Sequence, residues 1–185
     1  KTSTTINGYE GTNYEIHPVV IPEGSLLIDN PEGTAIGDWR VTTQRPGFEG
    51  ENYQYHVNAN GLDSFTWPIN IAAAGNYDVY AKWTTHPVHT ANAVYTVHHT
   101  GGETPVTVDQ KVKPAEWVLL GQFNLDSSSK IKLVDSTDGY TVADSILIVP
   151  KNSFIPGVAR WDLTPLTPAR YTLYAKWTAN STPSR

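Results

Sequence analysis

Hydrophobic and polar residues alternate along much of this 185-residue chain, most clearly in two nearly identical segments. Asn76–Thr84 and Arg170–Thr178 share six of nine residues and alternate in the same phase. In the first segment Tyr77, Val79 and Trp83 lie two or four positions apart, with polar residues between them. A half-buried β-strand has this period of two, because its successive side chains point to opposite faces. We therefore predict a strand at each segment.

Further short runs of this kind predict an all-β protein. The expected strands are Leu26–Asp29, Trp39–Thr43, Tyr53–Val57, Phe65–Ile71, Tyr77–Thr84, Ala93–His99, Pro105–Lys111, Trp117–Phe123, Lys130–Val134 and Ser145–Val149, with a further candidate at Asn13–His17. Apolar residues nowhere recur at helical spacing over a helical length. Asn30–Gly37 has the composition of a turn. These features predict a jelly-roll-like antiparallel β-sandwich.

A second repeat has a different offset. Gly8–His17 resembles Gly47–His56 at six of ten positions, and here the additional copy precedes its partner. The additional copy of the alternating strand follows its partner, whereas a tandem array would show one period throughout. We interpret the chain as one domain inserted into an exposed loop of a second, related domain. The complete domain is expected at 25–150, and strands of a partial second copy at 1–17 plus 158–185.

Composition narrows the choice of partners. The formal net charge is −5, from 13 basic and 18 acidic residues, and no basic cluster stands out, which argues against a nucleic-acid partner. The chain has no cysteine, so disulfides and thiolate metal ligands are excluded. No apolar run approaches the ~18 residues of a membrane span. The N-terminus lacks the pattern of a signal peptide, so we expect a fragment whose partners include the rest of a parent polypeptide.

Motifs for catalysis and metal binding are weak. No nucleophile elbow, P-loop or dinucleotide-binding motif is present, so we do not expect an enzyme. His86 and His89 lie on a proline-containing loop without a third ligand at fixed spacing, which favours structural histidines over zinc ligands. Asp29 and Asp144 flank the first and last strands of the inner domain and could share calcium if those strands are neighbours. Turn capping is the commoner role of aspartate, so no cofactor is expected, with structural calcium as the alternative.

Aromatic residues divide into a core group and a candidate binding group. Trp83 and Trp117 share their strand parity with apolar residues and are expected in the core. Other aromatic residues lie at strand ends or loops, where a rigid sandwich commonly displays its recognition residues. The candidate ligand-binding residues are Trp39, Tyr53, Tyr55 and Tyr140, with His86 as a polar partner.

An ordered set of motifs in the inner segment resembles a known family. The motifs are Asp29-Asn30, Gly37-x-Trp39, Gly47-Phe48-x-Gly50-x-x-Tyr53, Ala74-Gly75-x-Tyr77-x-Val79-Tyr80-Ala81-x-Trp83, Ala93-x-Tyr95-Thr96-Val97-x-His99, Val108-Asp109-Gln110, Trp117-x-x-Leu120-Gly121-x-Phe123 and Gly139-Tyr140-x-Val142-Ala143-Asp144. Together they resemble the golvesin C-terminal-like domain, also described as a xanthan-lyase carbohydrate-binding-like domain. The outer pieces resemble only the first half of this family.

This resemblance implies a β-sandwich appended to enzymes or toxins in large secreted bacterial proteins, including Rhs/YD-repeat proteins. The expected function is that of a non-catalytic accessory module outside the cell, which binds polysaccharide or another cell-surface glycan. The alternative is a structural spacer of a secreted toxin or enzyme, with no ligand of its own. An exposed aromatic platform would favour the binding module, and two carboxylates facing each other across a cleft would favour an enzyme.

Overall fold

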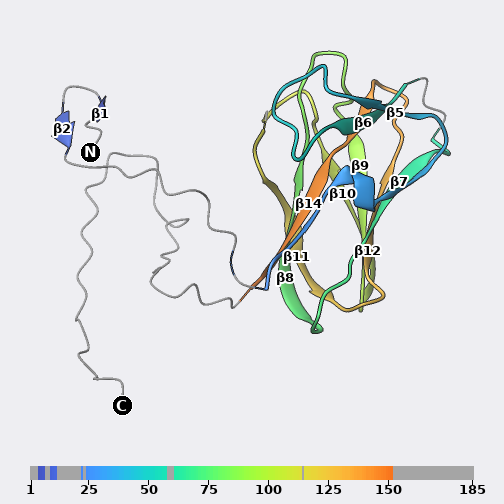
Figure 1. Ribbon diagram of the computed structural model, residues 1–185. Coiled ribbons are helices and arrows are strands. Elements are labelled where there is room, and N and C mark those ends of the chain that lie inside the picture. Colours follow the sequence, from blue (N-terminus) through green and yellow to red (C-terminus); the bar gives the residue numbers. More distant parts are fainter. Residues whose placement is uncertain are drawn as a thin grey trace, which may run out of the picture. The chain divides into compact units, whose positions relative to one another are not determined.

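The computed structural model describes residues 4–6, 9–11, 22, 24–57, 61–113 and 115–151 (Figure 1). Strands β1 (Thr4–Ile6) and β2 (Tyr9–Gly11) form an antiparallel hairpin. The expected strands at Asn13–His17 and Arg170–Thr178 lie outside the described residues. The division into an inserted domain and a partial second copy therefore stays a prediction.

Residues 24–151 form an antiparallel β-sandwich, which confirms the predicted fold class. One sheet has the order β10-β9-β12-β7-β4, the other the order β11-β8-β14-β3, and a third, β13-β6-β5, crosses one end (Figure 1). The strands are β3 (Leu26–Ile28), β4 (Thr34–Ile36), β5 (Trp39–Thr42), β6 (Tyr53–His56), β7 (Ser64–Pro68), β8 (Gly75–Lys82), β9 (Ala93–His99), β10 (Gly102–Val108), β11 (Val118–Leu125), β12 (Lys130–Val134), β13 (Thr141–Ala143) and β14 (Ser145–Pro150).

The alternating positions of the strands form the core between the two sheets. Val79 and Ala81 of β8 and Val97 of β9 are fully buried, and Tyr95 of β9 is nearly so. Trp83 is 1% exposed, and its indole Nε1 donates to the Val112 carbonyl at 3.1 Å, so its prediction as a core residue is confirmed. A tryptophan in a core adds a large buried area, and its indole N–H needs such a partner.

The prediction that Trp117 lies in the core is wrong. Trp117 is only partly buried, precedes β11, and has the Lys82 ammonium 5.5 Å from its ring centroid. The register of β11 against β8 shifts between Leu119 and Gly121, which marks a β-bulge. A bulge adds a residue to one strand and reverses the alternation beyond it. Trp117 therefore does not share the buried face of Phe123, although their spacing in the sequence suggests it.

Two other segments differ from the expected elements. The predicted turn at Asn30–Gly37 contains the short 3-10 helix η1 (Asn30–Glu32) and strand β4, which pairs with β7. The Asp29 carboxylate accepts from the Asn30 backbone N–H at 2.8 Å, and the Glu32 carboxylate accepts from the Asp29 N–H at 2.9 Å. This capping box satisfies backbone donors that the short helix leaves unpaired. Strand β13 was also not predicted, because three residues are too few to show a period.

The sandwich begins and ends at the same edge. Strand β3 pairs antiparallel with β14, and Ile28 lies opposite Ile146 in the register. A Cβ built on Gly24 would lie 3.4 Å from Pro150, so the two ends of the sandwich are neighbours. Adjacent ends are the geometry that insertion into a loop requires.

Candidate functional site

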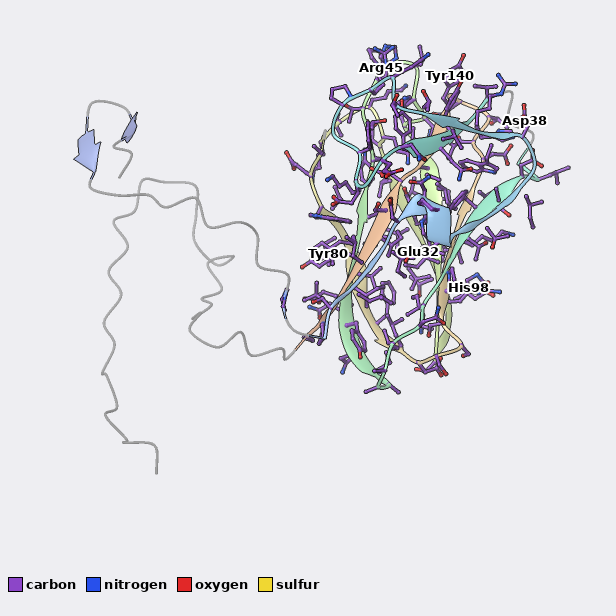
Figure 2. All side chains as sticks on the ribbon, in the orientation of Figure 1. Glu32, Asp38, Arg45, Tyr80, His98 and Tyr140 are labelled. Atoms are coloured by element: carbon purple, nitrogen blue, oxygen red, sulfur yellow. The ribbon has the colours of Figure 1, made fainter. Side chains whose placement is uncertain are left out.

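A recess opens at the end of the sandwich where β6 crosses. It is lined by Gln44, Arg45, Tyr53, Tyr55, His86, Val88, His89 and Tyr140, and its volume is about 80 Å³. These residues come from the β5–β6 connection, from β6, from the β8–β9 connection and from the loop before β13. Figure 2 shows Arg45 and Tyr140 at this end of the sandwich. The recess thus gathers side chains from four separate stretches of the chain.

The walls of the recess are held together by backbone hydrogen bonds between two loops. The Tyr140 N–H donates to the Val88 carbonyl at 2.9 Å, and the Thr90 N–H donates to the Tyr140 carbonyl at 2.8 Å. Gly139 allows this approach, because a Cβ at that position would lie 2.7 Å from the His89 carbonyl oxygen. That distance is shorter than a carbon–oxygen contact tolerates, so the close packing of the loops requires glycine.

A hydrogen-bonded cluster around Asp138 also stabilises these loops. The Asp138 carboxylate accepts from the Thr90 hydroxyl, from the Ser136 hydroxyl at 2.6 Å, and from the side-chain amide of Asn92 at 2.8 Å. These donors hold the pKa of Asp138 well below its usual value, with Ser136 and Thr90 the largest contributors. Because ionised carboxylates make the stronger hydrogen bonds, the charged side chain fixes the loop that carries Tyr140.

Two tyrosines form an aromatic platform at the recess. The rings of Tyr55 and Tyr140 are stacked, with centroids 5.9 Å apart and an interplanar angle of 25°. Tyr140 is 41% exposed, whereas Tyr55 is half-buried. Tyr53 is 3% exposed and packs against Phe48, with ring centroids 5.8 Å apart, so it lines the recess as part of the core. Among the three tyrosines that line the recess, Tyr140 is the most exposed and Tyr53 the most buried.

His86 and His89 line one polar side of the recess. Their ring centroids are 5.8 Å apart. His89 is 4% exposed, with Nδ1 3.1 Å from the Thr84 carbonyl oxygen. Burial lowers the pKa of His89 to about 4, so this ring is neutral at physiological pH. The His86 Nδ1 accepts from the Val88 N–H at 3.3 Å, which leaves Nε2 to carry the proton of the neutral ring.

The structure brings four of the five predicted ligand-binding residues to this recess: Tyr53, Tyr55, Tyr140 and His86. Trp39 does not line it. The Trp39 ring packs between His56 and Phe65, each with a centroid distance of 5.4 Å, and its Nε1 donates to the Ile36 carbonyl at 3.2 Å. These contacts give Trp39 a packing role, and its part in ligand binding stays a prediction.

Sequence reasoning did not select Gln44, Arg45, Val88 or His89 as lining residues. Arg45 follows Gln44 in a polar loop whose sequence resembles other surface loops. The available signal was the Pro46-Gly47 pair, whose composition is typical of a change in chain direction. The sequence favoured a structural role for His89 over zinc binding, and did not indicate that it lines a recess.

Asp29 and Asp144, the two candidate calcium ligands, both contact the Ser145 hydroxyl. The Ser145 hydroxyl donates to the Asp29 carboxylate at 2.7 Å and lies 3.3 Å from the Asp144 carboxylate. Asp144 is fully buried, accepts from the Glu49 backbone N–H at 3.1 Å, and has one oxygen without a hydrogen-bond partner. Within the described ranges, no three histidine or carboxylate side chains gather as a metal site would require. Calcium binding by the pair therefore stays an untested alternative.

Comparison with models of known protein families shows to which family this chain belongs. The golvesin C-terminal domain model matches residues 26–150, which is the whole sandwich. This chain belongs to the golvesin C-terminal domain family. The division of the chain into a complete domain at 25–150 and a partial second copy stays a prediction.

This golvesin-family chain is also similar to xanthan lyases. It is 29% identical to the xanthan lyase of Bacillus sp. (strain GL1) over 150 residues, which are 76% of this chain and 16% of the enzyme. A solved structure of Paenibacillus xanthan lyase matches with 32% identity and a TM-score of 0.65, over 69% of this chain and 13% of that one. The chain therefore corresponds to a small part of each enzyme.

Carbohydrate-binding modules of family 35 share the fold. The Podospora anserina GH26-CBM35 β-(1,4)-mannanase matches with 21% identity and a TM-score of 0.57, over 72% of this chain and 29% of that one. A family 35 module from Clostridium thermocellum matches with 14% identity and a TM-score of 0.53, over 68% and 98% of the two chains. In the part of the golvesin-family chain that the structure describes, no helix has the length and apolar character needed to span a membrane.

Proposed function

We propose that this golvesin-family domain is a non-catalytic accessory module that binds polysaccharide through the recess around Tyr55 and Tyr140. The observation that carries the proposal is the stacked tyrosine pair, with an exposed ring beside a small polar recess. A flat aromatic ring matches the C–H face of a sugar ring, and the few polar groups around it fix the orientation of the ligand. The recess residues would then act together as a binding site.

The relatives support a role alongside a larger protein. The matched xanthan lyases are several times longer than this chain, and the shared fold also occurs in carbohydrate-binding modules that accompany enzymes. The lining of the recess contains no carboxylate, so the paired carboxylates typical of a glycosidase are not found there. An accessory module that holds a parent protein against its polymer outside the cell fits these features.

The test is polysaccharide binding by tyrosine variants. Tyr140→Ala and Tyr55→Ala should each weaken retention of a soluble polymer in affinity gel electrophoresis, with xanthan and a β-mannan among the polymers tested. We expect a loss of tenfold or more, which corresponds to about 1.4 kcal/mol of binding free energy. Tyr53→Phe keeps the packed ring and tests only its hydroxyl. Circular dichroism melting confirms that each variant folds.

Tyr80→Ala is the matched control, because Tyr80 lies on β8 and does not line the recess (Figure 2). It should retain polymer as the parent does. Equal retention by the parent, Tyr55→Ala and Tyr140→Ala would exclude the recess as the site. A parent protein that retains no polymer across a broad panel would instead support the structural spacer.

A further inference from the structure

The recess carries an unbalanced positive charge in an acidic protein. The chain has a formal net charge of −5, yet Arg45 lines the recess and no aspartate or glutamate is among the other lining residues. Two cations elsewhere on the sandwich do have acidic partners: Arg40 pairs with Asp38 at 2.7 Å, and Lys82 pairs with Glu49 at 2.7 Å. Arg45 makes no ion pair with another described residue.

The other polar groups of the recess leave this charge uncompensated. The buried ring of His89 is neutral, and Arg45 and His86 each contribute to disfavouring its protonation. The amide of Gln44, the tyrosine hydroxyls and the His86 Nε2–H can all donate hydrogen bonds to a ligand. A guanidinium presents several N–H donors in a planar fork, which matches the two oxygens of a carboxylate. The recess is therefore rich in donors and has one fixed positive charge.

We infer that the recess selects polysaccharides that contain sugar acids, with Arg45 pairing the sugar carboxylate while the Tyr55–Tyr140 platform contacts the ring. This inference rests on the proposed polysaccharide-binding function and names its substrate class. A neutral sugar offers only hydroxyl groups to the guanidinium, whereas a uronate adds a charge-assisted, two-oxygen contact. Arg45 is thus the specificity-determining residue of the site.

The experiment compares each acidic polymer with its own carboxyl-reduced form. Polygalacturonate, alginate and xanthan are each tested before and after chemical reduction of the uronate carboxyl groups to primary alcohols. This treatment removes the charge and keeps the backbone linkages and ring stereochemistry. We expect the parent protein to bind at least one native polymer tenfold or more tightly than its reduced form. Arg45→Gln should lower affinity for the native polymer to the level of the reduced one.

Three controls separate recognition from general charge attraction. Lys130 is on β12, opposite His98 of β9 and away from Arg45 (Figure 2). Lys130→Gln removes one positive charge there and should bind the polymer as the parent does. Arg45→Lys keeps the charge but not the planar fork, so it should have intermediate affinity. Poly-glutamate supplies carboxylates without sugar rings and should not bind measurably.

The possible results distinguish this inference from the proposed function. Tight and equal binding of native and reduced polymers would overturn the role of the carboxylate and leave polysaccharide binding intact. An equal loss in Arg45→Gln and Lys130→Gln, or binding to poly-glutamate, would overturn specific recognition by Arg45. If neither form of any polymer nor a neutral polysaccharide binds, the proposed function fails and the inference fails with it.

Discussion

Asp144 gives the sharpest prediction for the stability of the sandwich. Its side chain is fully buried, and the carboxylate has two hydrogen-bond donors nearby, the Glu49 N–H and the Ser145 hydroxyl, both at the same oxygen. Burial, together with the nearby charge of Asp29, raises the pKa of Asp144 from its usual 3.8 to about 7. Asparagine resembles the protonated acid in shape and cannot ionise, so Asp144→Asn should stabilise the protein at neutral pH.

The size of the effect follows from the two pKa values. Between pH 3.8 and about 7 the folded protein retains a proton on Asp144 that the unfolded chain releases. The unfolding free energy of the parent therefore falls as pH rises through this interval and levels off above it. A difference of about three pKa units corresponds to about 4 kcal/mol, an upper limit for the gain from Asp144→Asn above pH 7. Below pH 4 the gain should vanish.

The assay is urea denaturation of both proteins at pH 4, 5.5 and 8. EDTA is present throughout, because a cation shared by Asp29 and Asp144 would neutralise the charge being measured. His89 has the opposite effect on the pH profile, since its lowered pKa of about 4 favours the folded state as pH rises, but both proteins contain it. The exposed Glu116 supplies the control Glu116→Gln, which should match the parent. Equal or lower stability of Asp144→Asn at pH 8 would refute the reasoning.

Two further predictions concern a buried amide and the second copy. Gln110 is fully buried, and its side-chain amide hydrogen-bonds the Tyr95 hydroxyl and both backbone groups of Val142. Gln110→Ala should therefore lower the unfolding free energy by about 3 kcal/mol, whereas Gln122→Ala at the surface should leave it unchanged. A small effect of Gln110→Ala in urea denaturation would contradict this. For the domain insertion, spin labels can be attached at Glu15→Cys and Thr172→Cys alone, because the chain has no other cysteine. The two labels should give one short, narrow distance distribution if the two segments lie side by side in one outer domain. A broad, long distribution would argue against a shared outer domain.

The fold was predictable because alternation and β-propensity agree along the chain. The buried positions Val79 and Ala81 of β8 are those that the sequence pattern assigns to the core. The error at Trp117 has a local cause, since the bulge before Gly121 reverses the alternation and leaves no mark on residue spacing. A single inserted residue in a ladder is set by the partner strand, which the sequence of β11 alone does not contain.

The recess was only partly predictable, because its residues meet through contacts between distant loops. Tyr55 and Tyr140 could be selected from their places near turns, yet nothing in their spacing shows that the two rings stack. The stacking depends on Gly139, which lets the Tyr140 loop approach the carbonyls of Val88 and His89. A glycine in a turn motif has many possible reasons, and only the structure shows that this one lets the Tyr140 loop approach its neighbour. The position of the Tyr140 ring therefore depends on how the two loops pack, and this packing requires a residue without a Cβ at position 139.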